Sequence, residues 1–286
     1  GVNYVRLRLW NDPYSEDGKP YGAGGNDFDT TLVLAKRALE KKMGFLLDFH
    51  YSDFWADPGK QIKPKAWANF GVEELEKAVY DFTFDSLSKV LDAGVNVTMI
   101  QVGNELSNGL LWPEGKVPNY DNIAKFVSAG IRACRKVNAN IPLMIHLDNG
   151  GNNELYVRWF ENYIKRGEVF EYIGLSYYPF WHGYLTAEQA TANGHKDNLV
   201  SAINTLATQF PDKRVQIVEA AYHFQYWPSQ GINYNTQNIW ACSVAGQYKF
   251  VRALVDALNP LPNVDGISYW FPEEAGNGDD TNWSAG

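Results

Sequence analysis

Short apolar runs alternate with longer amphipathic stretches along almost the whole chain. Seven runs rich in β-branched and aromatic residues predict strands, at residues 2–9, 45–49, 98–102, 143–147, 173–177, 215–218 and 267–270. Longer stretches with apolar residues at helical spacing predict helices, at residues 30–42, 73–93, 122–137, 155–166, 198–210 and 244–258. This alternation is typical of repeated βα units and a parallel sheet.

The ends and faces of the helices can be predicted as well. Asp29 is a candidate N-cap for the first helix, and Gly44 and Gly94 are candidate C-caps. The last helix has an apolar stripe that we expect to lie against the sheet. It consists of Val244, Tyr248, Val251, Val255 and Leu258.

The most fitting fold class is α/β, a (β/α)8 TIM barrel. Seven parallel strands cannot close an eight-stranded barrel, so we expect this chain to lack the first strand. We expect the last helix of the barrel to be missing as well. The 286 residues contain no linker or low-complexity tract, which predicts a single catalytic domain over residues 1–286. An open doubly wound sheet is the alternative, but no G-x-G-x-x-G turn follows the first strand.

Composition narrows the range of partners. A formal net charge of −8 argues against nucleic acid and anionic membrane surfaces, which would repel the protein. No uncharged apolar run reaches the roughly 18 residues of a membrane span. Aromatic residues form 15% of the chain, with 10 Trp and 17 Tyr, and their flat rings suit the C–H faces of sugars. The two cysteines, Cys134 and Cys242, have no metal-ligand or disulfide spacing.

Polar residues gather where the predicted strands end. In a barrel the active site lies at the carboxyl ends of the strands, so these residues are the candidates for chemistry. They are Arg6, Arg8, Trp10, Asp48, His50, Asp53, Asn104, Glu105, His146, Asp148, Tyr177, Tyr178, Glu219 and Trp270. A single polar strand end is more often structural, but seven of them together indicate a site.

Two glutamates stand out, because Glu219 follows an apolar strand directly and Glu105 follows one after Gly103 and Asn104. Paired carboxylates at one barrel mouth are suited to glycoside cleavage, in which one protonates the leaving oxygen and the other attacks the anomeric carbon. A separation of about 5 to 5.5 Å gives retention of configuration, and a longer one gives inversion. The sequence does not supply this distance.

Several stretches resemble glycoside hydrolase family 53, the endo-β-1,4-galactanases. They are VRLRLWNDP at 5–13, DFHYSDFWADPGKQ at 48–61, VGNE at 102–105, LWP at 111–113, IHLDNG at 145–150, GLSYYPF at 174–180 and VE at 218–219. The resemblance implies retaining endo-hydrolysis of β-1,4-galactosidic bonds in plant (arabino)galactan, with Glu105 as acid/base and Glu219 as nucleophile.

The resemblance also implies roles for the surrounding residues. Asn104 would bind the sugar 2-hydroxyl, Arg8 and Tyr178 would hold Glu219, and Trp270 would form the floor of the cleavage subsite. Further substrate contacts are expected from a polar and aromatic lining. It consists of Asp48, His50, Asp53, Trp55, Trp112, His146, Asp148, Trp181 and His182.

No cofactor and no metal are expected. Bacterial members of the family often hold calcium in a loop after the seventh strand, but residues 222–240 contain no Asp or Glu. The acidic stretch 276–280 is a weak metal candidate that we interpret as a solvated loop. The partner is a polysaccharide and the expected state is a monomer. We expect secretion because a polymeric substrate cannot cross a membrane, not because a leader is present.

Three alternatives stay open. A related β-glycanase such as a mannanase or cellulase would use the same glutamates, because loop contacts choose the substrate. A metal-dependent barrel hydrolase could use Asp48, His50, His146 and Asp148 as ligands. The third alternative is a non-catalytic sugar-binding barrel. The presence of both glutamates argues against it, because a protein that had lost its activity would most easily have lost them.

Overall fold

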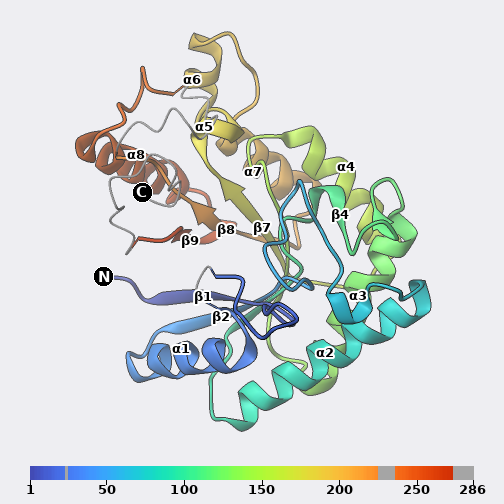
Figure 1. Cartoon of the computed structure of the whole chain (residues 1–286). Helices are drawn as coiled ribbons and strands as arrows, with labels where there is room; N and C mark the ends of the chain where they lie inside the picture. The colour runs from blue at the N-terminus through green and yellow to red at the C-terminus, as the bar shows by residue number, and fades with distance from the viewer. Residues whose placement is uncertain (23–24, 225–235, 273–286) are drawn as a thin grey trace. The chain divides into compact units, whose positions relative to one another are not determined.

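The computed structural model describes residues 1–22, 25–224 and 236–272 (Figure 1). These residues fall into two compact units. The first consists of Gly1–His146 and Trp159–Tyr172, and the second of Leu147–Arg158 and Ile173–Gly286. No helix among the described residues is long and apolar enough to cross a membrane.

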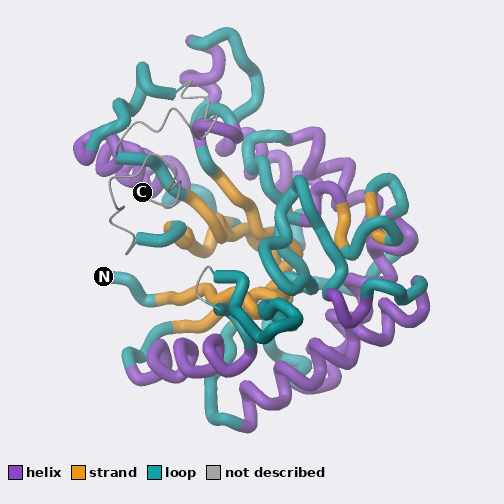
Figure 2. The backbone as a smooth tube through the Cα atoms, viewed as in Figure 1, coloured by secondary structure: helices purple, strands orange, loops and turns teal. Residues whose placement is uncertain are grey.

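Four parallel strands form the sheet of the first unit. They are β1 (Tyr4–Leu9), β2 (Gly44–Phe49), β3 (Met99–Val102) and β6 (Leu143–Leu147), which are neighbours in this order. Strands β2, β3 and β6 consist almost entirely of buried residues, as parallel strands covered on both faces do. A short antiparallel pair, β4 (Gly109–Leu110) and β5 (Gly115–Lys116), forms a separate sheet (Figure 2).

The helices of this unit connect its strands. They are α1 (Phe28–Glu40), α2 (Val72–Asp92) and α3 (Tyr120–Val137), with the 3-10 turns η1 (Lys65–Trp67) and η2 (Leu106–Asn108) between them. Helices α2 and α3 pack side by side (Figure 1). Helix α4 (Asn153–Ile164) follows β6.

Three further strands belong to the second unit. They are β7 (Tyr172–Tyr177), β8 (Arg214–Ala220) and β9 (Val264–Tyr269), in this order, with β9 parallel to β8. The helices are α5 (Pro179–His182), α6 (Ala187–Ala192), α7 (Leu199–Gln209) and α8 (Val244–Leu258). All seven predicted strands and all six predicted helices are therefore present, with bounds that differ by a few residues.

Two predicted helix caps are wrong. The N-cap of α1 is Asp27, whose side chain accepts the Thr30 N–H at 2.7 Å, and Asp29 lies in the first turn. Gly44 does not cap a helix but begins β2, where a Cβ atom would lie 2.3 Å from the ring of Tyr4. Close packing, not a turn, thus requires this glycine. Gly94 has a left-handed φ of 81° just after α2, as predicted for a C-cap glycine.

The predicted packing face of α8 is also wrong for most of its members. Val244, Tyr248 and Val255 are exposed, and the buried stripe is instead Gly246, Phe250, Leu254 and Leu258. Phe250 explains the choice, because its ring stacks on Tyr222 at 5.1 Å and contacts Trp240 at 5.3 Å. The helix has two apolar stripes, and the one with the larger interlocking rings is buried.

Candidate active site

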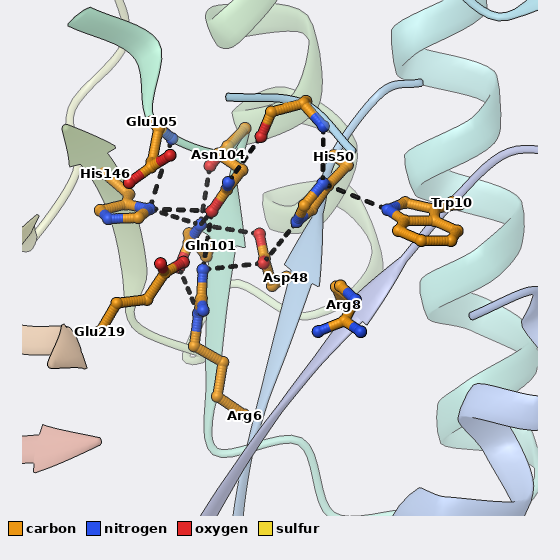
Figure 3. A network of polar contacts seen from close by, with 12 residues as sticks. Arg6, Arg8, Trp10, Asp48, His50, Gln101, Asn104, Glu105, His146 and Glu219 are labelled. Carbon is orange, nitrogen blue, oxygen red and sulfur yellow. Dashed lines mark hydrogen bonds and ion pairs between the residues drawn. The ribbon is translucent and has the colours of Figure 1, made fainter. Parts of the chain in front are cut away.

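A chain of buried polar side chains links the ends of β1, β2 and β3 (Figure 3). The Asp48 carboxylate on β2 is 2.9 Å from the guanidinium of Arg6 on β1, and both side chains are buried. It also accepts a hydrogen bond from the Gln101 side-chain amide on β3, at 2.7 Å. Buried charges need such paired, hydrogen-bonded surroundings, so Asp48 and Arg6 depend on each other.

His50 is held in one tautomer by its neighbours. Its Nδ1 accepts the Trp10 indole N–H at 3.2 Å and the Ala56 backbone N–H at 3.3 Å. The other ring nitrogen, Nε2, lies 3.1 Å from the Asp48 carboxylate and therefore carries the hydrogen. Asp48 and His50 thus use their polar atoms on protein partners, and the Arg6 cation beside Asp48 disfavours a metal ion there.

Asn104, the second residue after β3, is fixed through both ends of its amide. Its Oδ1 accepts from Arg6 at 2.7 Å and lies 2.9 Å from His146 Nδ1, while its Nδ2 donates to the Ala56 carbonyl at 2.8 Å. Among the described contacts, this bond uses one of the two Nδ2 hydrogens. Gln101 completes the arrangement, since its Oε1 accepts from Arg6 at 2.9 Å.

Glu105 lies in an unusual backbone conformation. It precedes the 3-10 turn η2 with a left-handed φ of 49° and ψ of 54°, and Gly103 before it has a φ of 84°. A residue with a side chain rarely adopts this region, and such residues cluster at functional sites. Its backbone N–H points at His146 Nδ1, 3.3 Å away.

Trp55 and Trp112, two predicted site residues of the first unit, belong to two separate groups of contacts. In one, the Arg8 guanidinium lies 4.1 Å over the ring of Trp55, which in turn packs edge-on against Trp10. In the other, the Trp112 indole donates to the Asn108 carbonyl at 2.9 Å, and the Lys116 ammonium lies 4.3 Å over its ring. Cations on both tryptophan rings fix their planes.

Asp53 organises a loop. Its carboxylate accepts the backbone N–H of Asp12 at 3.0 Å and that of Lys65 at 2.8 Å. These bonds join the segments after β1 and β2, so the structure gives Asp53 a scaffolding contact beside the expected substrate contact.

Glu219 lies near the end of β8, in the second unit, and is nearly buried. Tyr178, directly after β7, donates its hydroxyl hydrogen to Glu219 Oε2 at 2.9 Å. The exposed fractions of the two residues are 3% for Tyr178 and 6% for Glu219. The predicted pairing of Tyr178 with Glu219 is therefore present in the structure.

Trp181 and His182 are the last two residues of the short helix α5, and they differ in their contacts and exposure. The Tyr178 backbone N–H donates to His182 Nδ1 at 3.1 Å, and desolvation lowers the pKa of His182 to about 3. His182 is therefore neutral and helps to fix the backbone of Tyr178, since an imidazolium could not accept the hydrogen bond from the Tyr178 N–H. Trp181 is 48% exposed, with its ring edge-on to Tyr178 and the ring centroids 5.5 Å apart.

The remaining predicted site residues also follow strands. Asp148 comes directly after β6 and is half-buried. Trp270 comes directly after β9, where its backbone N–H donates to the Ala220 carbonyl at 2.9 Å. Two predictions about metal binding concern the loop 222–240 and the acidic stretch 276–280. Residues 225–235 of that loop and all of the stretch 276–280 lie outside the described residues.

Three functional candidates were missed by the sequence reasoning or left out of the predicted lining. Arg6 is a charged residue inside a strand, and Gln101 is the polar residue of an otherwise apolar strand. Gln61 closes the DFHYSDFWADPGKQ stretch, and its amide reaches the backbone of Asn104 and Glu105. In-strand polarity was the available signal for the first two, whereas nothing local marks Gln61.

Solved structures with the same fold define the class of protein. The GH53 catalytic domain of Ignisphaera aggregans matches with a TM-score of 0.83 at 37% identity, over 94% of this chain and 74% of that one. A structure of fungal β-1,4-galactanases matches with a TM-score of 0.80 at 30% identity, over 95% and 78%. They confirm the predicted fold class, a TIM-barrel-like glycoside hydrolase.

Sequence comparison then identifies the family. The pattern of glycosyl hydrolase family 53 matches residues 1–286. The endo-β-1,4-galactanase of Bacillus subtilis is 36% identical over 279 residues, which cover 95% of this chain and 61% of that enzyme. The chain belongs to glycosyl hydrolase family 53, and it is therefore a glycoside hydrolase.

Proposed function

We propose that this protein hydrolyses β-1,4-galactosidic bonds inside galactan chains with retention of configuration. Glu105 is the acid/base and Glu219 the nucleophile. The observation that carries the proposal is that the local structure fixes the position of each glutamate. Glu105 follows β3 in a left-handed turn, and Glu219 lies near the end of β8. Tyr178 binds the Glu219 carboxylate at 2.9 Å, and the left-handed turn after β3 sets the direction of Glu105. Relatives named endo-β-1,4-galactanase support galactan as the substrate.

The chemistry assigns the two carboxyl groups different tasks. In the first step Glu105 protonates the leaving glycosidic oxygen while the Glu219 carboxylate attacks the anomeric carbon, which breaks the C–O bond and forms a glycosyl ester. In the second step Glu105 removes a proton from water, which attacks the same carbon and releases Glu219. Retention requires the carboxyl groups to stand about 5 to 5.5 Å apart.

The polar network supplies the substrate contacts. The remaining Asn104 amide hydrogen is suited to the sugar 2-hydroxyl, an interaction that strengthens in the transition state. Trp55 and Trp112, with their planes fixed by Arg8 and Lys116, serve as stacking platforms. The substrate, galactan side chains of pectin, is an extracellular polymer, and this supports secretion.

Reducing-end release from β-1,4-galactan, mannan, xylan and soluble cellulose tests the proposal. The expected result is activity on galactan that Glu219→Gln and Glu105→Gln both lose, while Glu73→Gln, a change in an exposed ion pair with Lys125, retains it. Preference for mannan or cellulose would keep the mechanism and replace the substrate. Full activity of either proposed catalytic variant would refute the assignment of that residue.

A further inference from the structure

The backbone conformation of Glu105 needs external support. Its left-handed φ of 49° is disfavoured for a residue with a Cβ atom, and Gly103 two residues earlier is also left-handed. Such a conformation persists only where the surrounding structure imposes it. The direction in which the Glu105 side chain leaves the backbone depends on this turn, so whatever holds the turn also aims the carboxyl group.

The side-chain amide of Gln61 lies where that support is needed. Its Nε2 donates to the Asn104 carbonyl at 2.8 Å and lies 3.3 Å from the Glu105 carbonyl. Gln61 is only 2% exposed, so water cannot easily replace these bonds. Two successive carbonyl groups that converge on one amide fix the orientation of the peptide between them.

Gln61 is itself rigidly placed. It follows the turn in which Asp57 and Lys60 exchange backbone hydrogen bonds of 2.9 and 3.0 Å. Its own carbonyl accepts the backbone N–H of Trp112 at 2.8 Å. The Asp57–Gln61 turn therefore connects the Glu105 turn on one side with the Trp112 platform on the other.

We propose that Gln61 is a positioning residue that acts through Glu105. Its amide holds the Asn104–Glu105 peptide in the left-handed turn and so keeps the Glu105 carboxyl group aligned with the leaving oxygen. This inference rests on the proposed role of Glu105 as the acid/base. Gln61 itself touches neither substrate nor reacting atoms, and its contribution is therefore confined to the steps in which Glu105 transfers a proton.

Leaving groups of different basicity separate this role from a general folding role. A galactan bond needs a proton from Glu105, whereas a 2,4-dinitrophenyl group leaves without one. Gln61→Met keeps the length of the side chain and removes the amide. We expect it to lower kcat/KM on galactan about 10- to 100-fold, which is part of the rate enhancement that general acid–base catalysis usually provides. On 2,4-dinitrophenyl β-galactobioside we expect kcat/KM to fall by less than about threefold. Added azide, which replaces the water that Glu105 activates, should raise the turnover of the variant on the activated substrate.

Two further variants complete the test. Gln61→Glu has the same shape but turns a carboxylate oxygen toward the two carbonyl groups, so it should show the same leaving-group dependence, and it is used if Gln61→Met does not fold. Gln247→Met is the control, because it removes an amide that donates to the Tyr222 carbonyl at 2.8 Å and to the Tyr269 hydroxyl at 3.1 Å. Any loss in this control should be equal on both substrates.

The outcomes are distinct. Equal losses on both substrates for the Gln61 variants, or wild-type rates on galactan, would overturn the inference while leaving the proposed function intact. A wild-type protein that cleaves neither galactan nor the activated galactobioside would instead overturn the proposed function, and the inference with it.

Discussion

Replacing Tyr178 by phenylalanine removes one hydroxyl group and leaves the ring in place. The lost bond is the 2.9 Å hydrogen bond to Glu219 Oε2. Hydrogen bonds to a charged group contribute about 1.5 to 3 kcal/mol. Because Tyr178 and Glu219 are almost fully buried, a water molecule cannot easily replace the lost hydroxyl group as a donor to the Glu219 carboxylate. We therefore expect kcat/KM on galactan to fall about 10- to 150-fold, since about 1.4 kcal/mol corresponds to a factor of ten.

The neighbouring residue provides a matched control. Tyr177 is also buried, and its hydroxyl donates to the Gly183 carbonyl at 3.1 Å. The Tyr178 hydroxyl binds Glu219 and the Tyr177 hydroxyl binds a backbone carbonyl, so Tyr177→Phe makes the same chemical change at a different partner. Initial rates of reducing-end release on galactan, combined with thermal unfolding of both variants, give the comparison. If Tyr177→Phe lowers kcat/KM as much as Tyr178→Phe does, the effect is structural and the reasoning about Glu219 is refuted.

Two stability predictions follow from the same contacts. Asp48→Asn removes the carboxylate that pairs with the buried Arg6 guanidinium, so we expect urea unfolding to show a loss of about 3 to 5 kcal/mol. The change Asp57→Asn, in a half-exposed ion pair with Lys60, should cost less than about 1 kcal/mol, and equal losses would contradict the argument. For His182, the folded-state pKa of about 3 lies below the unfolded value near 6.5, so protonation favours unfolding as the pH falls. Between pH 6.5 and 3, the His182 side chain should lower the free energy of unfolding of the wild type by up to about 1.4 kcal/mol per pH unit. Urea unfolding at a series of pH values should show that this contribution is absent in His182→Gln.

The sequence predicts the strands well because parallel strands buried on both faces are uniformly apolar and end sharply. Asp48 and Glu105 follow or close such runs and were found for that reason. The face of α8 was wrong because two stripes satisfy the same helical spacing, and only the ring contacts of Phe250 decide between them. Periodicity reports which residues share a face but not which face is covered.

Contacts between distant segments account for what the sequence could not give. Gln61 and Glu105 are 44 residues apart, and their contact depends on how two loops meet. The contact of His182 with substrate stays a prediction, and nothing in the sequence indicated that its Nδ1 accepts a backbone N–H from Tyr178. A motif gives the residue type that a site needs, but the partner of each atom emerges only from the folded chain.

Trapping the glycosyl ester tests the central assignment most directly. A 2-deoxy-2-fluoro β-galactobiosyl fluoride slows the second step, so the intact protein should gain the mass of one fluorinated galactobiosyl group. Peptide mapping should place that group on Glu219, and the Glu219→Gln variant should gain nothing. An active protein that forms no adduct, or one labelled on Glu105 or another carboxylate, would contradict the assignment of Glu219 as nucleophile.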